Sequence, residues 1–468
     1  MKRPLFVKLS AIALLMLLLM IPISMINGVI NDRKQLHENV IEEIARSSSY
    51  SQRLVGPVLV VPYVKNIKEW KIDAETKVRY QEDIKLNGQL YFLPEAFVVD
   101  GKLKSEKRSR GIYEARLYHA DNNISGHFEV PGNYGITDEL LAYEFGAPYV
   151  AMGIKDIRGI ENALKIRIND DLVDMAPSTR LKILGDGVHA LIKIPDLQQK
   201  SRLNFSLNLV LQGTESLRVV PIGRESNVKL SSDWPHPSFI GNYLPVKREI
   251  TDAGFIADWR TSYFSSNLAE SFNLCADENN CDAFANSDFG VSLIDPVNQY
   301  VKSDRAIKYA LLFIALTFAS FFLFEILKRL MVHPVQYGLV GLALAFFYLL
   351  LLSLSEHIGF GAAYLISSLA CILLIGTYVS HVLQSLLRGI GFTAGLAVLY
   401  GMLYGLLCAE DYALLMGSIL LFALLGIFML LTRKVDWYSF GAASVVARNI
   451  GAANVETTHV GAAKSMRD

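Results

Sequence analysis

Six long apolar stretches constrain the fold of this chain more than any other feature. They cover residues 9–30, 309–327, 334–355, 358–380, 389–409 and 412–432. Each is long enough to cross the hydrocarbon core of a bilayer, which takes about 20 helical residues. Because lipid offers the backbone no hydrogen bonds, each stretch is expected to be a helix. The sequence therefore predicts six transmembrane helices, one N-terminal and five C-terminal.

The first stretch has two interpretations. Lys2, Arg3 and Lys8 precede or begin it, as in a cleaved secretory signal peptide. The apolar part is long for a signal peptide, however, and no clear small-x-small cleavage site follows it. We favour an uncleaved anchor that covers residues 1–30.

Lys and Arg residues around the stretches predict the orientation of the chain. Basic residues occur before the first stretch, after the second and the fourth, and in the C-terminal tail, whereas the other two short loops carry Glu356, Glu410 and Asp411 instead. Basic flanks favour the cytoplasmic side of a membrane. Both termini are therefore expected in the cytoplasm and residues 31–308 in the periplasm, as in a multi-pass protein of a bacterial inner membrane.

The composition agrees with a chain that lipid partly solvates. Charged residues make up 19% of it, whereas soluble domains contain about 25%. The formal net charge is zero, so no nucleic-acid partner is indicated, because such proteins carry a basic excess. Membrane lipid is an expected partner, and the sequence indicates no oligomeric state.

Residues 31–308 have the composition of a soluble domain. Residues 32–46 are expected to continue the first helix outward, and in 203–209 apolar and polar residues alternate strictly, which predicts a sheet with one wet face. Pro57 and Pro62 are expected at strand ends or edges. The other expected strands lie at 58–61, 89–92, 112–118, 126–130, 163–168 and 188–194. We predict an α+β membrane protein with a large, β-rich, antiparallel periplasmic domain.

The chain is accordingly divided into four parts. They are the N-terminal anchor (1–30), the periplasmic domain (31–308), a five-helix transmembrane bundle (309–438) and a cytoplasmic tail (439–468). The tail is rich in Gly and Ala and is expected to be disordered. Residues 277–289 are expected to form a helix or an acidic loop.

Cys275 and Cys281 lie in a polar stretch of the periplasmic domain, where a disulfide would close a small loop. Such a bond requires an oxidising compartment, and the sequence leaves the pair open between bonded and free. Cys371 and Cys408 lie in apolar stretches, where a thiol behaves as a small apolar group. The four cysteines show no zinc-binding spacing.

Several motifs resemble those of a known family. They include RLVGP at 53–57, SDWPHPSF at 232–239, RAIKY at 305–309, HPVQY at 333–337, SLSEH at 353–357 and TRKVDWY at 432–438. In these the chain resembles, over nearly its whole length, the CreD inner-membrane proteins. The resemblance implies an inner-membrane location and a role in envelope stress or integrity, in a regulon run by a two-component system. It implies no reaction mechanism and no catalytic residue.

The charged residues in and beside the stretches are candidate functional groups. Glu325 is the one charge inside a stretch and marks a functional site by default, although an i,i+4 ion pair with Arg329 explains it as well. Glu356 and His357 follow the third stretch, where such a pair senses pH or passes a proton, or simply ends a helix in headgroup water.

The segment with Trp234, Pro235, His236 and Phe239 is a candidate recognition surface, because aromatic anchors concentrate binding energy. The alternative is a stiff crossover whose aromatics fill the core. Ser232 and Asp233 next to His236 lack the surroundings of a catalytic nucleophile, and the acidic run at 277–282 lacks the spacing of a calcium loop. No catalytic, cofactor-binding or metal site is predicted.

Two functions from different classes follow. The first is a non-enzymatic envelope protein whose periplasmic domain binds an envelope protein, glycan or lipid. The second is a transporter or channel formed by the helices, against which the scarcity of ionisable residues in the stretches counts. A membrane-linked hydrolase has no motif to support it.

Overall fold

The computed structural model describes residues 3–72, 79–137, 139–194, 198–278, 281–293, 299–328, 332–383, 385–408 and 413–433. It divides into two compact units. We call His37–Pro296 the β unit, and Met1–Leu36 together with Val297–Asp468 the helical unit. The expected cytoplasmic tail, 439–468, lies outside the described residues.

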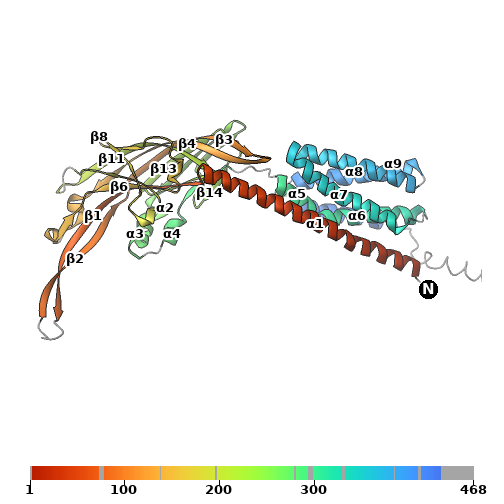
Figure 1. Cartoon of the computed structure of the whole chain (residues 1–468), viewed down its shortest axis with the longest axis horizontal. Helices are drawn as coiled ribbons and strands as arrows, with labels where there is room; N and C mark the ends of the chain where they lie inside the picture. The colour runs from red at the N-terminus through yellow and green to blue at the C-terminus, as the bar shows by residue number, and fades with distance from the viewer. Residues whose placement is uncertain are drawn as a thin grey trace, which may run out of the picture. The chain divides into compact units, whose positions relative to one another are not determined.

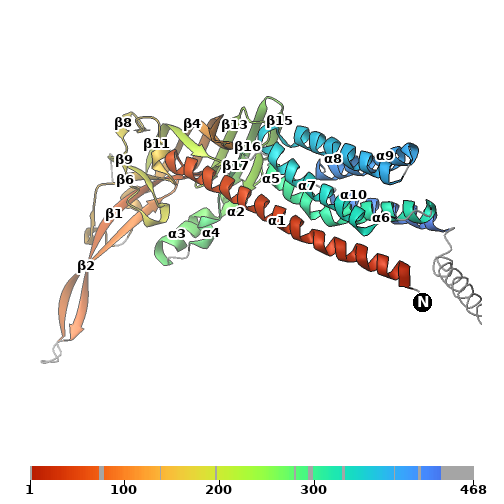
Figure 2. The same cartoon turned by 45° about the vertical axis from the view of Figure 1, so that its right-hand side comes forward.

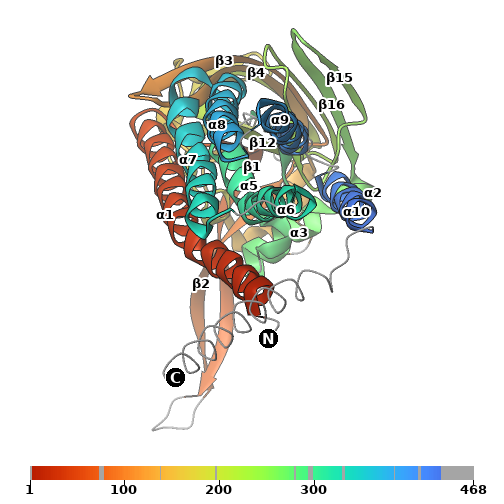
Figure 3. The same ribbon diagram turned by 90° about the vertical axis from the view of Figure 1, so that its right-hand side faces the viewer.

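Helix α1 (Arg3–Ser47) contributes residues to both units. The prediction that the first apolar stretch continues as a helix through 32–46 is therefore confirmed. In the helical unit α1 packs on α7 (Figure 3), where Gly341 provides the room that Leu19 occupies. In the β unit its last turns place Ile44 in a small buried cluster with Ala115 and Leu117.

Six further helices of the helical unit are described. They are α5 (Gln299–Lys308), α6 (Ala310–Lys328), α7 (Pro334–Ile358), α8 (Phe360–Val382), α9 (Leu386–Cys408) and α10 (Ala413–Thr432). Helix α5 lies before the stretch at 309–327, and the other five fall on the predicted stretches. Figure 3 looks along these helices and shows α7, α8 and α9 as neighbours. Apolar residues cover most of their surface, as expected of helices solvated by lipid.

The prediction of six spans needs a correction. In the described part of the chain, four helices are long and apolar enough to cross a membrane: Val7–Ser47, Pro334–Ile358, Phe360–Val382 and Leu386–Cys408. The count rises to five if α5 and α6, which meet at a bend of 46°, form one broken span. The stretch at 309–327 is thus no straight span of its own, because the charged helix α5 leads into apolar α6 through this bend. Helix α10 forms as expected but is not among the four.

Two sheets form the described part of the β unit. The first sheet has the strand order β14 (Ser238–Gly241), β17 (Phe289–Ser292), β12 (Ser216–Val220), β1 (Gln52–Ile72), β6 (Tyr149–Ile154), β10 (Gly187–Leu191) and β9 (Ala176–Pro177). Strands β2 (Arg79–Phe92) and β5 (Tyr143–Phe145) also pair with β1. The second sheet has the strand order β15 (Lys247–Thr251), β16 (Gly254–Ser262), β13 (Glu225–Ser232), β3 (Ala96–Arg110), β4 (Tyr113–Val130), β11 (Ser201–Thr214), β7 (Lys165–Ile168) and β8 (Asp171–Asp174).

The two sheets enclose one hydrophobic core. Leu59 and Met152 of the first sheet belong to the same buried cluster as Phe97, Phe205 and Trp259 of the second. The other face of the first sheet is covered by α3 (Leu268–Glu278) and α4 (Asp282–Ala285), which Figure 2 shows side by side. Short helices connect several strands: α2 (Tyr263–Ser266), η1 (Gly132–Gly135), η2 (Leu140–Ala142), η3 (Ile157–Gly159) and η4 (Lys182–Leu184).

Each predicted strand overlaps an observed strand, but 112–118 and 126–130 belong to the single strand β4, and 163–168 and 188–194 extend beyond β7 and β10. The strict alternation at 203–209 is confirmed, because β11 alternates between buried and exposed side chains. The all-antiparallel prediction is wrong for two pairs, since β1 runs parallel to β12 and β13 runs parallel to β3. Pro57 and Pro62 lie inside β1 and not at its ends. A shift of the β1–β6 register between Val55 and Val58 accommodates Pro57, because a bulge needs no N–H from that position.

Strands β1 and β2 continue beyond the sheet as a two-stranded hairpin (Figure 1). Their pairing runs from Leu59 opposite Phe92 to Ile72 opposite Arg79. Figures 1 and 2 both show this hairpin extending from the rest of the β unit. Near its described end the side chain of Trp70 is 63% exposed.

Candidate functional site

Glu325 is a buried carboxylate near the end of α6, with 7% of its surface exposed. Its Oε1 forms an ion pair with Lys8 Nζ of α1 and accepts a hydrogen bond from the backbone N–H of Val332 at 3.3 Å. Its Oε2 accepts a hydrogen bond from the Tyr337 hydroxyl of α7 at 2.9 Å. Arg329, the partner expected from the sequence, lies outside the described residues. Glu325 therefore joins α1, α6 and α7.

The start of α7 explains how Tyr337 reaches this carboxylate. His333 caps the helix, because its Nδ1 accepts a hydrogen bond from the Val335 N–H at 3.3 Å. The Gln336 side chain accepts one in return from the His333 N–H at 3.1 Å, which completes a capping box. Pro334 occupies the first helical position, where no N–H is needed. These residues fix the beginning of α7 and place Tyr337 in its first turn.

Glu356 forms a second carboxylate centre near the end of α7. Its Oε1 lies 3.7 Å from Arg33 Nε of α1 and accepts a hydrogen bond from the Tyr300 hydroxyl of α5 at 3.2 Å. His357, which the sequence paired with Glu356, is exposed. The structure thus joins Glu356 to α1 and α5 and leaves His357 at the surface of the helical unit.

The two carboxylate centres lie at opposite ends of α7. Tyr337 and Glu356 are 19 positions apart, about 28 Å along a helix axis. That length is close to the roughly 30 Å of a bilayer core. On α1, Lys8 and Arg33 have a corresponding separation of 25 positions, or about 38 Å. Helix α1 is therefore ion-paired to its neighbours near both ends of its apolar segment.

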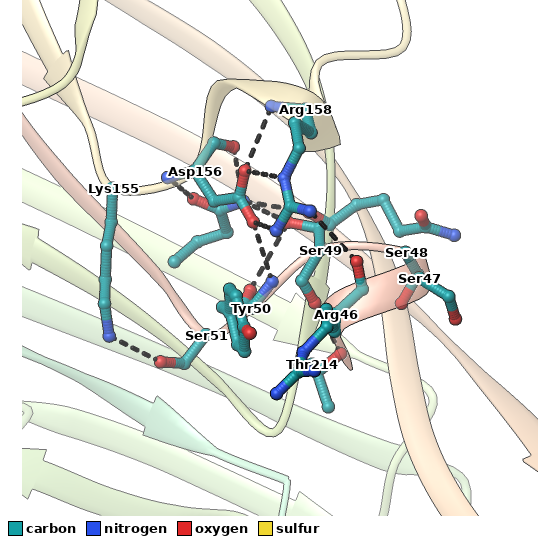
Figure 4. A network of polar contacts seen from close by, with 12 residues as sticks. Arg46, Ser47, Ser48, Ser49, Tyr50, Ser51, Lys155, Asp156, Arg158 and Thr214 are labelled. Atoms are coloured by element: carbon teal, nitrogen blue, oxygen red, sulfur yellow. Dashed lines mark hydrogen bonds and ion pairs between the residues drawn. The ribbon is translucent and has the colours of Figure 1, made fainter. Parts of the chain in front are cut away.

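A third polar centre holds the last turn of α1 within the β unit (Figure 4). Asp156 is 8% exposed and accepts two hydrogen bonds from Arg158, from Nε to Oδ1 at 2.9 Å and from Nη2 to Oδ2 at 2.6 Å. Arg158 Nη1 donates to the backbone carbonyl of Arg46 at 2.9 Å, near the end of α1, where helix carbonyls lack partners. The Tyr50 N–H donates to Asp156 Oδ2 at 3.1 Å. This guanidinium therefore ties the helix end to the sheet.

Buried hydrogen bonds fix the segment between α1 and β1. Gln52 Nε2 donates to the carbonyls of Asp156 at 2.9 Å and Gln212 at 3.1 Å, and to Ser49 Oγ at 2.6 Å. Gln52 Oε1 accepts from the Asp156 N–H at 3.2 Å. The Thr214 hydroxyl donates to the Ser49 carbonyl at 2.6 Å. The chain leaves α1 in one defined direction because these side chains satisfy its backbone groups.

Electrostatics keep this centre charged. Arg158 lowers the pKa of the Asp156 carboxyl, the N–H of Tyr50 adds to this effect, and burial opposes it. Asp156 in turn raises the pKa of the Arg158 guanidinium. At neutral pH both groups are therefore ionised and the attachment is intact.

His119 of β4 lies between two carboxylates in the same unit. Its Nδ1 is 3.0 Å from Glu161 Oε1 and its Nε2 is 2.8 Å from Glu106 Oε2. Glu161, followed by Glu106, raises the pKa of His119, while burial acts in the opposite direction. The His119 ring, followed by Arg108, lowers the pKa of Glu106. When protonated, the imidazole pairs with Glu106 of β3 on one side and with Glu161, which follows η3, on the other.

The Trp234 segment mostly serves packing. Trp234 packs on the hydrophobic core with the guanidinium of Arg116 3.6 Å from its ring centroid, and its Nε1 donates to the His236 carbonyl at 3.1 Å. Phe239 also packs on the core, Pro235 is half-buried and the His236 side chain is exposed. The structure therefore favours the alternative interpretation of this segment, a stiff crossover.

Cys275 and Cys281 are joined by a disulfide. Cys275 lies on α3 and is buried against the first sheet with Phe272 and Phe284. The bond ties α3 to the start of α4, so these two short helices cover the sheet as one piece. Cys371 and Cys408 are free.

Comparison with known proteins identifies the family to which this chain belongs. The family described as "Inner membrane protein CreD" matches residues 4–438. The chain belongs to the CreD family. The inner membrane protein CreD of Escherichia coli (strain K12) is 40% identical to it over 445 residues, which cover 94% of this chain and 95% of that protein. The family resemblance of the sequence motifs is thus confirmed, and with its apolar helices this CreD-family chain is a multi-pass protein of the inner membrane.

Sequence reasoning found the carboxylates of this CreD-family chain but missed their partners. Lys8 and Arg33 flank the first apolar stretch, and basic residues in that place signal orientation in any membrane protein. Asp156 shows no pattern in the sequence, because Tyr50 and Gln52 reach it from a segment more than 100 positions away.

Proposed function

We propose that this protein contributes to cell envelope integrity or to the response to envelope stress, and that it does so without catalysis. One observation carries the proposal: α1 is held by ion pairs in the helical unit and by the Asp156 centre in the β unit. In the helical unit, Glu325 and Glu356 form the ion pairs with α1. In the β unit, Arg158 donates a hydrogen bond to the end of α1. An element secured in this way suits a protein that links a state of its soluble part to its membrane part.

The non-enzymatic part of the proposal rests on how the buried charges are used. Glu325, Glu356 and Asp156 each bridge separate elements of the fold. Asp288 does the same, since its carboxylate pairs with Arg53 at 2.8 Å and with Arg218 at 3.2 Å. Charges that serve in such bridges hold elements together, whereas a catalytic group needs access to a substrate.

The proposed topology has both termini in the cytoplasm and residues 31–308 in the periplasm. The distribution of Lys and Arg supports it. The Cys275–Cys281 disulfide supports it independently, because such bonds persist in oxidising compartments. Alkaline phosphatase inserted near residue 150 should be active in cells, and a fluorescent protein at the C-terminus should fold. An inactive phosphatase would refute the topology.

Binding through the β unit is the second part of the proposal, and the end of the β1–β2 hairpin is its best surface. Trp70, Ile72 and Tyr80 are all exposed there, and aromatic side chains at such positions commonly anchor partners. The expected partner is an envelope protein, glycan or lipid. A photocrosslinking residue at position 70 should give an adduct in intact cells, whereas one at exposed Lys229 of β13 should not. Adducts from position 234 alone would favour the Trp234 segment instead.

The function itself is tested by complementation. Cells that lack the protein are compared with cells that express it or its variants for growth in detergent with EDTA. Glu325→Gln and Asp156→Asn should each reduce rescue by more than any loss of their abundance in the membrane explains. Full rescue by both variants would show that the attachments of α1 are not needed for the function.

The alternative, a transporter or channel, makes a different prediction for Glu325. If Glu325 acts only as a partner of Lys8, the double variant K8M/E325Q should regain part of the rescue that E325Q loses, because no charge is left unpaired. If Glu325 carries a transported ion or proton, the double variant should be as defective as E325Q.

A further inference from the structure

Three buried hydroxyls of α7, α8 and α9 have no hydrogen-bond partner among the described residues. They belong to Tyr348 of α7, Ser367 of α8 and Tyr400 of α9, which are 2%, 0% and 1% exposed. Nearly all buried polar atoms in native proteins are paired with protein atoms or ordered water. A hydroxyl that lacks both is destabilising, and more so where the surroundings are lipid and not water.

The three hydroxyl-bearing residues lie in one region of the helical unit. The Phe347 ring centroid is 5.0 Å from that of Tyr348 and 4.8 Å from that of Tyr400. Tyr364 is also beside Phe347 at 5.6 Å, and its hydroxyl donates to the Tyr400 carbonyl at 2.7 Å. Ser367 follows Tyr364 by three positions, so the two share a face of α8.

Cys371 adds a thiol to the same face of α8. It is buried, it donates to the Ala343 carbonyl at 3.6 Å, and the Tyr400 hydroxyl approaches it. A thiol is a weak hydrogen-bonding group and does not replace an oxygen partner. Ser367 and Cys371 both border a groove of about 400 Å³ between α7 and α8.

The chemistry of this region selects an uncharged ligand. Residues 334–355, 358–380 and 389–409 contain no Asp, Glu, Lys or Arg, so an ion there would have no counter-charge. Water both donates and accepts, and a buried water makes about three hydrogen bonds. We propose that the hydroxyls of Tyr348, Ser367 and Tyr400 form a water-binding site inside the packing of α7, α8 and α9.

This hydroxyl cluster, Tyr348, Ser367 and Tyr400, is separate from the ion-paired centres at Glu325 and Glu356. It gives the helices an uncharged polar interior, which the proposed function does not require. The water-binding site is therefore tested independently of the proposed function.

The first test uses the thiol of Cys371 as a probe for water. Thiolates and not thiols react with methanethiosulfonates, and a thiolate forms only where water is present. In full-length protein with C408A, Cys371 should react with methyl methanethiosulfonate at least tenfold faster than a cysteine at position 373. The control L373C is made in C371A/C408A, and Leu373 is a suitable position because it lies on α8 and is 63% exposed on the outside of the helices. Equal or slower reaction of Cys371 would overturn the proposal.

The second test measures thermal unfolding of detergent-solubilised variants. Y348F removes one anchor of the bound water and should lower the melting temperature. Y364F removes a hydroxyl that has a protein partner, so its effect gives the scale of one lost hydrogen bond. In a dry interior Y348F would delete an unsatisfied group and raise the melting temperature. A raised or unchanged value for Y348F would therefore contradict a hydrated site.

Discussion

Lys8 of α1 and Glu325 of α6 are 317 positions apart in the chain and form an ion pair in the helical unit. The pair joins the first apolar helix to the C-terminal group of helices. Tyr337 hydrogen-bonds the same carboxylate, so the start of α7 depends on the pair as well.

Breaking this pair should be strongly destabilising. E325Q leaves the Lys8 ammonium without its counter-charge, and loss of one partner of a buried pair costs about 3–5 kcal/mol. Part of the Lys8 side chain is exposed, so the lower end of that range is expected. Thermal unfolding of the full-length protein in detergent measures the effect.

The double variant K8M/E325Q tests whether the two residues act on each other. It should be more stable than the two single variants predict, with a coupling free energy of about 1–3 kcal/mol. K308Q is the matched control, because the Lys308 side chain is 68% exposed in its i,i+4 pair with Asp304 and such pairs contribute at most about 1 kcal/mol. Strictly additive effects of K8M and E325Q would show that the pair stabilises nothing.

Replacing Asp156 should loosen the end of α1 in the β unit. In D156N the Arg158 guanidinium loses a charged acceptor, and hydrogen bonds to charged groups are worth about 1.5–3 kcal/mol. Hydrogen exchange of the amides at 44–50 should become faster as a result. K155M is the control, since Lys155 makes an exposed contact with Ser51 and should change stability by no more than about 0.5 kcal/mol. Unchanged exchange in D156N would show that the network does not hold the helix.

Local patterns explain which parts of this fold were predictable. Apolar length placed the helices, and alternation placed β11, because both depend on neighbours in the sequence. The 46° bend between α5 and α6 was missed, since the charged residues before Tyr309 were assigned to the periplasmic domain and not to a helix that leads into α6. The parallel pairing of β1 with β12 joins segments more than 150 residues apart, and no local period reports such a pairing.

The candidate site shows the same division. Glu325 was predictable because a charged residue within an apolar stretch is recognised from its sequence neighbours alone. Its partners Lys8 and Tyr337 became visible only when α1 and α7 were placed beside α6. The prolines at 57 and 62 misled the strand assignment, because a register shift in β1 tolerates what a regular central strand excludes.

Removing the disulfide should destabilise the cover of the first sheet. The bond closes a short loop between positions six apart, for which chain entropy predicts about 2 kcal/mol. C275S/C281S should therefore unfold at lower urea concentration, as measured by tryptophan fluorescence. C408S, which changes a free and exposed thiol, should leave unfolding unaffected. In cells, maleimide should label positions 275 and 281 only after reduction, and labelling without reduction would contradict a bonded pair.

His119 should make the stability of the β unit depend on pH. Its pKa is raised by Glu161 and Glu106, so its folded pKa exceeds the unfolded value of about 6.5. A group of this kind stabilises the fold fully below its unfolded pKa, and this contribution is lost as the pH rises through the folded pKa. H119Q should therefore lower the urea midpoint more at pH 5.5 than at pH 8.5. E106Q/E161Q leaves the ring without its carboxylates and should reduce the same pH dependence, whereas an equal effect of H119Q at both pH values would mean that the ring contributes packing and not charge.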